Sequence, residues 1–250
     1  MIQLKNVSKA YDTTRALRNI DLTIAEGMTT VVIGPSGSGK STLLRLIIGL
    51  TYPDTGAVYF RGTEILPDVA LSLRRSMGYV IQEGGLFPHL TALDNVTLMA
   101  RYVGWSNDRM ARRVIELSDL TQFPRDGLRR FPAQLSGGQR QRVSLMRALM
   151  LHPEVLLMDE PLAALDPMIR SDLQTDLKKV FEALKPTVVL VTHDMNEAAF
   201  LGDTIVVLSD GRMIQRGALA DLVQSPVDPF ITRFINAQCN RVTANKQDAR

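Results

Sequence analysis

The chain has 250 residues, of which 45% are hydrophobic and 22% are charged, and its formal net charge is +3. This length allows one large domain or two small ones, and the composition is that of an ordinary globular protein. The charge is too small to indicate a nucleic-acid partner, no apolar run reaches the roughly eighteen residues that span a bilayer, and a single cysteine, Cys239, excludes an internal disulfide.

The first part of the chain alternates strands with a helix. Its pattern predicts a hairpin over 1–12 and 15–27, a buried strand, glycine loop and helix over 28–50, a strand pair over 55–65 and a short apolar strand over 76–83. The helix is expected to stop at Gly49. The N-terminal segment lacks the apolar core of a secretory signal, so we expect no leader, and the lone cysteine favours a reducing compartment.

The middle and the end of the chain differ in pattern. Between residues 86 and 149 the pattern is helical, because apolar residues recur three and four apart over 90–104 and 108–120. Beyond it we expect a strand over 154–161, a helix over 169–184, a strand over 186–194, a short helix over 196–202 and a hairpin over 203–217. The hairpin turns at Asp210-Gly211.

Strands that alternate with helices indicate an α/β fold with a mostly parallel sheet. The helical block interrupts that alternation as an insertion, and the antiparallel pairs form a smaller second sheet. We therefore expect one domain over 1–235, with the core and β subdomain in 1–85 and 150–222 and a helical subdomain in about 86–149. Residues 236–250 lose the apolar period and are expected to form a disordered tail.

A glycine-rich loop stands between the buried strand and the helix of 28–50. Gly34, Gly39, Lys40 and Ser41 fit the pattern G-x-x-x-x-G-K-S. In that context glycines let backbone N–H groups curl around phosphate oxygens, the lysine meets the β- and γ-phosphates, and the serine hydroxyl meets Mg²⁺. The alternative is a chance glycine turn, which the flanking strand and helix disfavour.

Two acids end the buried strand of 154–161. Burying charge is costly, and in sheets of this kind the strand ends line the ligand crevice. Asp159 is therefore predicted to hold Mg²⁺ and Glu160 to polarise an attacking water. The alternative is that the pair caps the following segment. His193 and Gln82 also end strands and are predicted to face the same edge, whereas His89 and His152 have no such placement.

A second anion site is predicted about a hundred residues after the first. Ser136 stands at the N-cap position of a helix that opens on two glycines, which exposes backbone N–H groups at its positive end. Six arginines also cluster between Arg125 and Arg147. They favour a solvated basic face, and the alternative is a surface for anionic lipid or a partner.

The order of these motifs, namely P-loop, Gln82, LSGGQ at 135–139, VLLMDE at 155–160, LD at 165–166 and TH at 192–193, resembles the ATP-binding subunits of ABC transporters. The resemblance covers about residues 2–235, and LSGGQ is highly specific to the family. It implies a P-loop NTPase (RecA-like) fold, an intact ATP and Mg²⁺ site and active ATP hydrolysis.

The resemblance also assigns site residues. The nucleotide-binding residues would be Tyr11, which stacks on adenine, then Gly34, Pro35, Ser36, Gly37, Ser38, Gly39, Lys40, Ser41, Thr42, Ser136, Gly137, Gly138, Gln139 and Asp166. The catalytic residues would be Glu160, His193 and Gln82, and the metal ligands Ser41, Gln82 and Asp159. Asp166 would lie in the loop that couples two sites across a dimer.

The implied partners account for the two anion sites. In the family two subunits pack head to tail, and the P-loop of one and the LSGGQ of the other close on the same ATP. A second copy of the chain, an integral-membrane permease and, indirectly, a solute-binding protein are therefore expected, with no nucleic acid. The expected place is peripheral, at the cytoplasmic face of the inner (plasma) membrane.

Segments 78–96, 157–177 and 191–217 look like the ATPases of bacterial importers for glycine betaine, choline and related osmoprotectants. ATPases of polar amino-acid importers and phospholipid-trafficking systems are similar and rank next. We expect no C-terminal pair of regulatory domains. Non-transport members of the superfamily usually carry coiled-coil insertions or tandem cassettes, and this sequence shows neither, so that class is disfavoured. A scaffold that binds ATP without hydrolysing it is also disfavoured, because Glu160 and His193 are present.

Overall fold

The computed structural model describes residues 1–82, 84–163 and 165–247, with side chains described up to residue 238, so the side chain of Cys239 lies outside the described ones. The chain forms two compact units. The first unit is Met1–Pro67 with Val189–Arg250, and the second unit is Asp68–Val188.

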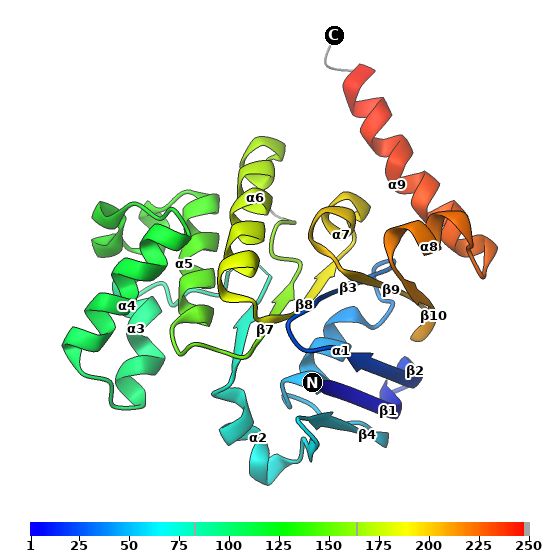
Figure 1. Ribbon diagram of the computed structural model, residues 1–250, viewed down its shortest axis with the longest axis horizontal. Helices are drawn as coiled ribbons and strands as arrows, with labels where there is room; N and C mark the ends of the chain where they lie inside the picture. The colour runs from blue at the N-terminus through cyan, green and yellow to red at the C-terminus, as the bar shows by residue number, and fades with distance from the viewer. Residues whose placement is uncertain (83, 164, 248–250) are drawn as a thin grey trace. The chain divides into compact units, whose positions relative to one another are not determined.

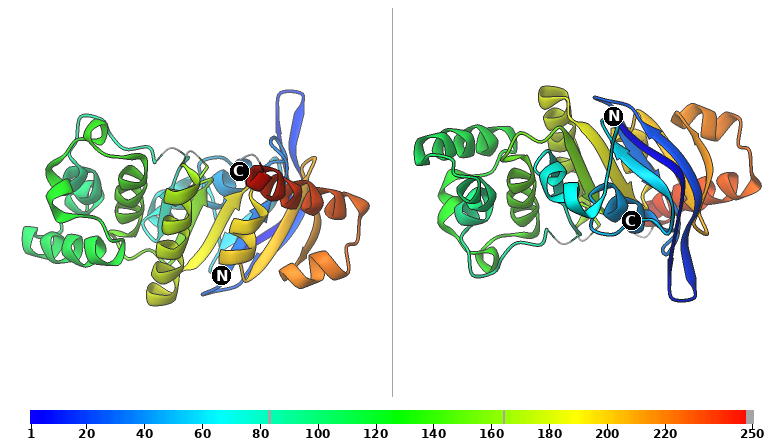
Figure 2. Two further views of the ribbon diagram at one scale, coloured as in Figure 1. Left: turned by 90° about the horizontal axis from the view of Figure 1, so that it is seen from above. Right: turned by 90° about the horizontal axis from the view of Figure 1, so that it is seen from below.

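The first unit contains a four-stranded antiparallel sheet in the order β2-β1-β4-β5. Its strands are β1 (Ile2–Tyr11), β2 (Thr14–Ile24), β4 (Thr55–Phe60) and β5 (Thr63–Glu64). Apolar residues of β1 and β2 pair and are buried together, as with Leu4 opposite Leu22. The predicted smaller sheet is thus confirmed, and Figure 2 shows the β1–β2 hairpin as a long ribbon at the edge of this unit.

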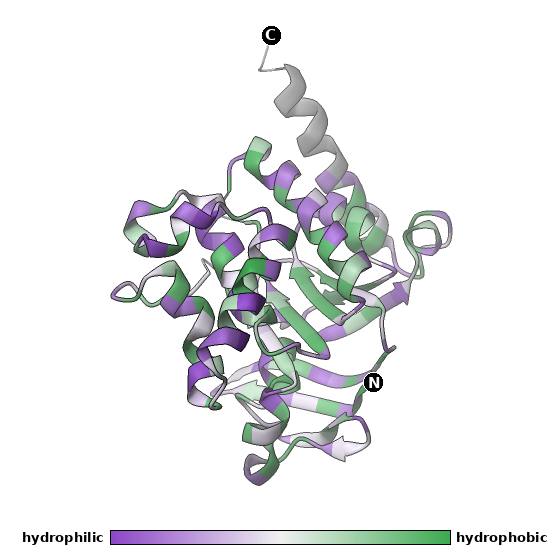
Figure 3. Ribbon diagram, turned by 60° about the vertical axis from the view of Figure 1, so that its left-hand side comes forward, coloured by the Kyte–Doolittle hydropathy of each residue, from purple (hydrophilic) through white to green (hydrophobic). Residues whose placement is uncertain are grey.

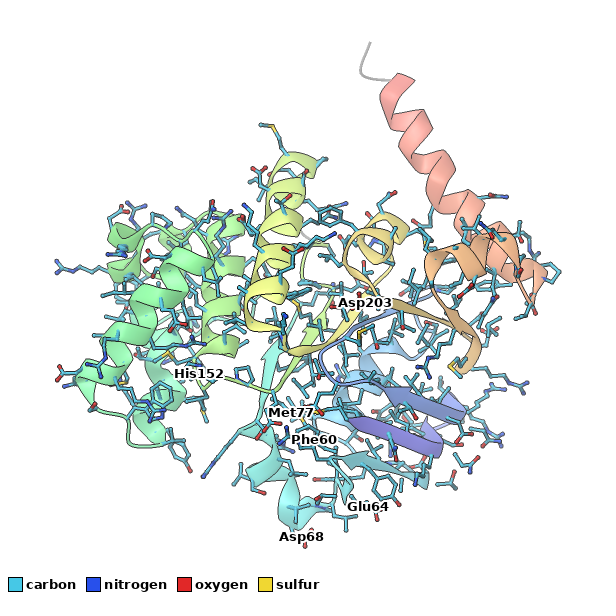
Figure 4. The ribbon with its side chains drawn as sticks, viewed as in Figure 1. Phe60, Glu64, Asp68, Met77, His152 and Asp203 are labelled. Carbon is cyan, nitrogen blue, oxygen red and sulfur yellow. The ribbon has the colours of Figure 1, made fainter. Side chains whose placement is uncertain are left out.

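Four further strands of the first unit lie in the order β10-β9-β3-β8. They are β3 (Thr29–Ile33), β8 (Thr187–Thr192), β9 (Thr204–Ser209) and β10 (Arg212–Gly217), and the boundary between the units falls within β8. β3 and β9 are parallel, and Asp203, labelled in Figure 4, accepts a hydrogen bond of 2.8 Å from Thr29 N at the start of β3. β9 and β10 form the predicted hairpin, in which Asp210 and Gly211 both have positive φ.

Four helices belong to the first unit (Figure 1): α1 (Lys40–Ile47), α7 (Met195–Leu201), α8 (Leu219–Gln224) and α9 (Pro229–Gln247). α1 ends before Gly49, which has a φ of 69°, as predicted. The disordered tail expected over 236–250 differs from the structure, since α9 continues to Gln247 and only 248–250 lie outside the described residues. Residues 236–247 contain neither glycine nor proline, so no residue breaks the helix that begins at Pro229.

The second unit pairs two parallel strands with five α-helices among its described residues. These elements are β6 (Met77–Val80), β7 (Val155–Asp159), α2 (Pro67–Arg74), α3 (Ala92–Tyr102), α4 (Asn107–Leu120), α5 (Gly137–Leu149) and α6 (Pro167–Leu184), with 3₁₀ turns at Arg125–Arg129 and Pro132–Gln134. The pattern did not predict α2. α5 packs against α3, α4, α6 and β6, which is why this unit is larger than the expected helical subdomain of 86–149.

Apolar residues gather along the strands in Figure 3, while the helices carry mixed faces. All five residues of β3 and of β7 are buried. Of the predicted arginine cluster, Arg125, Arg129, Arg130 and Arg140 are exposed, whereas Arg142 and Arg147 are half-buried. Arg125 pairs with Asp119, Arg130 with Asp126 and Arg142 with Asp176, the last at 2.6 Å in a largely buried position.

Candidate functional site

The P-loop of the first unit connects β3 to α1. Lys40 opens α1 and is buried, and its Nζ donates to the carbonyl oxygens of Gly34 at 2.9 Å and Pro35 at 2.8 Å. The lysine therefore folds back over the loop that precedes it. This geometry puts a positive charge beside the N-terminus of α1, where an anion is favoured.

Carbonyl oxygens of β9 and β2 lie close to two glycines of the P-loop. A Cβ at Gly34 would lie 2.1 Å from Leu208 O, and a Cβ at Gly39 would lie 2.3 Å from Ala16 O. Ser38 is 2% exposed, and its hydroxyl makes no hydrogen bond among the described residues. A buried hydroxyl without a partner is costly, so the loop is suited to a ligand that carries hydrogen-bond acceptors, such as a phosphate.

Tyr11 ends β1 in the first unit and is 41% exposed. The Lys9 ammonium lies 5.5 Å from the centroid of its ring. The exposed ring is available for stacking on a flat ligand such as a base.

His193 follows β8 and is exposed, and the residues on either side of it are fixed. Thr192 Oγ1 donates to Glu197 Oε2 at 2.6 Å and accepts from Asp194 N at 3.0 Å. Asp194 also caps α7, since its Oδ1 accepts from Asn196 N. Thr192 and Glu197 are positioning residues that the sequence pattern did not predict. The signal available in the sequence was an acid four residues after the histidine, which the structure shows to be buried.

Asp159 and Glu160 lie at the end of β7 in the second unit. Asp159 is 7% exposed, and Glu160 has a φ of 45°, which is unusual for a residue other than glycine and turns the chain sharply after the strand. α6 is capped by Asp166, whose Oδ1 accepts from Ile169 N at 3.1 Å.

Gln82 is exposed and follows β6, and it begins a loop that runs to Thr91. From α5, Ser144 Oγ and Arg147 Nη2 both donate to Gly84 O, at 2.8 Å and 2.9 Å. Arg147 Nη1 also donates to Gly85 O at 2.8 Å. The loop after Gln82 is thus held by side chains from a helix about sixty residues later in the chain.

Asn95 of α3 holds the other end of this loop. It is fully buried, its Oδ1 accepts from Phe87 N at 2.8 Å, and its Nδ2 donates to the carbonyl oxygens of Phe87, Leu90 and Thr91. The sequence pattern did not single out Asn95 or Ser144, and it placed Arg147 only in the arginine cluster. Their polar atoms lie on inward helix faces, where the periodicity predicts only apolar packing.

The LSGGQ segment opens α5 with a capping box, which confirms the predicted N-cap. Ser136 Oγ accepts from Gln139 N at 3.2 Å, and Gln139 Oε1 accepts from Ser136 N at 3.0 Å. A Cβ at Gly138 would lie 2.7 Å from Ile169 of α6, whereas Gly137 is less crowded. Ser136 is exposed, and the first turn of α5 contains no acidic residue, so this helix end can meet an anion.

An apolar groove of about 450 Å³ lies in the second unit, bounded by α2, β6, the loop after β6, α3 and α5. Met77, labelled in Figure 4, lines it at the start of β6. Phe87 is 44% exposed and Tyr102 71% exposed on its wall. The charged residues among those that line it are the three arginines Arg74, Arg75 and Arg147, and burial lowers the pKa of the Arg147 guanidinium.

The predicted site residues fall into two sets. The P-loop, Tyr11 and His193 belong to the first unit, and the second unit carries Gln82, the 136–139 segment, the acid pair and Asp166. No three residues of the types His, Cys, Asp or Glu gather as a metal cage among the described residues. None of the described helices has both the length and the apolar character needed to cross a bilayer.

A protein-family model described as ABC transporter matches residues 17–163, which is more than half of the chain. The chain belongs to the ABC transporter family. It is 41% identical to the choline transport ATP-binding protein OpuBA of Bacillus subtilis (strain 168), over 95% of this chain and 63% of that protein. It is 42% identical to the glycine betaine uptake system ATP-binding protein YehX of Escherichia coli (strain K12), over 94% of this chain and 76% of that protein.

Another ABC relative, the sulfate/thiosulfate import ATP-binding protein CysA of Synechococcus elongatus, is 43% identical over 94% of this chain and 67% of that protein. Because the matched region is 63% of OpuBA, the chain spans less than two thirds of the length of that relative. Among solved structures, a dimeric ATP-binding cassette in a post-hydrolysis state bound to ADP and Pi is 39% identical, with a TM-score of 0.79, over 88% of this chain and 99% of that chain. The predicted P-loop NTPase fold is confirmed.

Proposed function

We propose that this ABC transporter chain is the ATP-hydrolysing subunit of an importer for a quaternary amine or a related osmoprotectant. Its place would be peripheral, at the cytoplasmic face of the inner (plasma) membrane. The observation that carries the proposal is the P-loop, in which Lys40 folds over its own loop beside the buried, unpaired Ser38 hydroxyl. The relatives named for choline and glycine betaine support the cargo class.

The first unit would bind the nucleotide. Tyr11 stacks on the adenine, and the amides of residues 34–42 surround the phosphates. On ATP binding, Lys40 exchanges its two carbonyl partners for the β- and γ-phosphates, which an ammonium on a flexible stem can do. Binding thus needs little rearrangement of the backbone.

The second unit would supply the groups for hydrolysis. Phosphoryl transfer depends on positioning and charge neutralisation more than on covalent chemistry. Glu160 orients the attacking water and accepts its proton, and its φ of 45° turns the chain sharply after β7. His193 holds the γ-phosphate and the water in line, with its loop fixed by Thr192 and Glu197.

A magnesium ion fits the donors available, because Ser41, Gln82 and Asp159 all offer the oxygen ligands that Mg²⁺ prefers. When bound, it would neutralise charge that develops on the phosphates. The described residues contain no cage of acidic side chains, so the remaining ligands would be water and phosphate oxygens.

A second copy of the chain would complete each site. The exposed helix end at Ser136 has no acidic residue in its first turn, and we assign it to the γ-phosphate held by the other copy. The backbone that follows Asp166 would connect the two sites. The dimeric cassette solved with ADP and Pi supports this arrangement.

The test uses Glu160→Gln, which keeps the size and hydrogen bonding of the side chain but removes the base. We expect turnover to fall by about 10²–10⁴-fold while ATP still binds. The variant should elute as a dimer in ATP and as a monomer without nucleotide, because closure persists when hydrolysis cannot reopen it. Gel filtration and isothermal titration measure the two effects.

The matched control adds Ser136→Arg, which blocks the contact across the dimer but leaves the P-loop intact. The double variant should bind ATP and remain monomeric. Near-normal turnover in Glu160→Gln would remove Glu160 from the catalytic role. A Glu160→Gln protein that binds ATP yet stays monomeric would refute the assignment of Ser136 to the partner's nucleotide.

The permease is proposed to dock in the apolar groove of the second unit. The loop that forms one wall begins at Gln82, so an occupant of the groove would sense the metal site through that loop. Phe87→Glu should preserve the hydrolysis of the isolated chain but abolish transport by the assembled complex. Ile115→Glu is the control, since Ile115 is 45% exposed on α4 outside the groove. Transport that survives Phe87→Glu would place the docking surface elsewhere.

A sulfate or thiosulfate importer is the second candidate for the cargo, because the Synechococcus relative is 43% identical. Uptake of labelled choline, glycine betaine and sulfate by the reconstituted transporter separates the two. Sulfate uptake without quaternary-amine uptake would overturn the proposed cargo and leave the ATPase assignment in place.

A further inference from the structure

Another cavity of the first unit, of about 410 Å³, lies on the antiparallel sheet. It is bounded by β1, β2, the start of β4 and the first residue of β10. None of residues 34–42 lines it, so it is separate from the P-loop. In Figure 2 the β1–β2 hairpin that forms two of its walls is the long blue ribbon. Its volume is within the range typical of small-molecule sites.

The cavity is positively charged. Lys9, Arg15, Arg18 and Arg212 line it together with one carboxylate, Asp54. Asp54 is already engaged, since its Oδ1 accepts from Lys9 Nζ and its Oδ2 accepts from Ala10 N, both at 2.7 Å. The hydrogen bonds from Lys9 and then Ala10 lower the pKa of this carboxyl, which keeps it charged and bound to Lys9. Within the described part of the chain, the three arginines have no carboxylate partner.

The backbone fixes the three arginines near one another. The β9–β10 turn rests directly on β2, where Arg18 N donates to Gly211 O at 2.7 Å. Gly211 has a φ of 75°, and a Cβ there would lie 2.8 Å from Ala16 O, so the turn approaches β2 as closely as only glycine allows. Arg212 comes immediately after this contact, and Arg15 and Arg18 flank it on β2.

Arg15, Arg18 and Arg212 are all exposed and carry the same charge around one cavity. Water and salt screen their repulsion, and an anion in the cavity would offset the part that remains. A guanidinium is a planar group whose N–H donors can bind two oxygens of one phosphate at the same time. Several guanidinium groups around one cavity therefore favour a ligand that carries more than one phosphate group. We propose that this cavity is a second anion site, which binds a small molecule with two or more phosphate groups. The strands that form this cavity are not the P-loop elements of the proposed ATP site. Its ligand would be bound by guanidinium side chains, whereas the P-loop would bind phosphates through loop amides.

The test is a titration of inorganic pyrophosphate into the full chain saturated with ADP, in magnesium-free buffer. ADP occupies the P-loop, so further binding reports another site. We expect one pyrophosphate per chain, with affinity weakened by about tenfold or more in Arg18→Gln and in Arg212→Gln, as for the loss of one charge-assisted phosphate contact. Arg216→Gln is the matched control, because Arg216 is exposed on the same strand but outside the cavity.

Titration of ADP alone separates the two sources of the same chemistry. A second ADP bound per chain, and lost in Arg18→Gln and Arg212→Gln, would identify a nucleotide as the occupant and would also support the site. If the ADP-saturated chain takes up no pyrophosphate while ADP binds once, the proposal is overturned. It is equally overturned if both variants bind pyrophosphate as the unmodified chain does. Equal melting temperatures of the variants exclude unfolding as the cause, and the proposed ATPase is unaffected by either outcome.

Discussion

The P-loop of the first unit and the loop 82–91 of the second unit both follow a buried strand, but different forces hold them. The P-loop is shaped by its own backbone, with glycines where neighbouring carbonyls leave no room for a Cβ and Lys40 folded over the loop. The loop 82–91 is held by side chains from other helices, chiefly Asn95 and Arg147. Local spacing reveals the first kind of loop in a sequence, whereas the second depends on contacts distant in the chain.

The largest effect is expected from breaking the backbone of the P-loop. In Gly39→Ala the residue must keep a φ of 102°, and its Cβ would lie 2.3 Å from Ala16 O, a backbone atom that cannot move alone. The free energy of unfolding should fall by roughly 3 kcal/mol or more, from strain and overpacking together. Urea denaturation measures the loss, and titration should show a parallel loss of ATP affinity.

Gly37→Ala is the matched control in the same loop. Gly37 has a φ of 78°, but nothing lies within 4 Å of a Cβ added there. The cost should be limited to the left-handed conformation, about 1–2 kcal/mol. Equal losses at the two positions would mean that backbone conformation alone, and not the contact with β2, shapes the loop.

The fold was largely predictable because its signals are local. The buried runs of β3 and β7, the helical spacing of α3 and α4 and the Asp210-Gly211 turn each indicated their structure. The N-cap at Ser136 was predictable for the same reason, since a serine directly before a helical pattern is enough to indicate a cap. For the P-loop the spacing of two glycines and a lysine encodes the geometry directly.

The features that the sequence pattern did not predict depend on tertiary contacts or on the continuation of a helix. Asp166 looked like a coupling residue, and the structure adds that its side chain caps α6. Thr192 and Glu197 fix the His193 loop through a buried hydrogen bond that no spacing rule describes. α9 continues through residues whose pattern had suggested a tail, because extending an existing helix costs less than starting one and residues 236–247 contain neither glycine nor proline.

The second prediction tests the loop that side chains hold. Asn95→Ala removes the partner of Phe87 N and of three carbonyl oxygens, in a fully buried place. We expect the free energy of unfolding to fall by roughly 2–4 kcal/mol, because buried polar groups lose their hydrogen bonds. The ATP affinity of the isolated chain should change little, and stimulation of hydrolysis by the assembled permease should be reduced.

Asn107→Ala supplies the comparison, since Asn107 is exposed at the start of α4, and its cost should stay within about 0.5 kcal/mol. A loss of ATP affinity in Asn95→Ala as large as in Gly39→Ala would contradict the distinction between the two loops. It would mean that the loop 82–91 shapes the nucleotide site itself instead of connecting it to a partner.

The smallest effect concerns Asp94, at the point where the loop 82–91 enters α3. Its carboxylate accepts hydrogen bonds from Arg101 and, at 2.5 Å, from Thr91 Oγ1, and these two contacts, the one from Arg101 first, lower its pKa below 3.8. A carboxyl whose pKa is lower in the folded state contributes stability above the unfolded value, and that stability is lost as the pH falls through the folded value.

Asp94→Asn should therefore destabilise the protein at neutral pH by less than about 1 kcal/mol, because the site is partly exposed and its ion pair is screened. The difference between Asp94→Asn and the unmodified chain should begin to narrow as the pH falls below 3.8, and it should disappear once the pH is below the lowered pKa of the folded Asp94, where its carboxyl is also uncharged. Urea denaturation at neutral pH and at low pH measures it, with Asp172→Asn on the exposed face of α6 as the control for net charge. A difference that stays constant through the acid range would show that Asp94 acts through its shape as a helix-start residue. Thr91 and Asn95 would then hold the junction between the loop and α3 without an electrostatic contribution from Asp94.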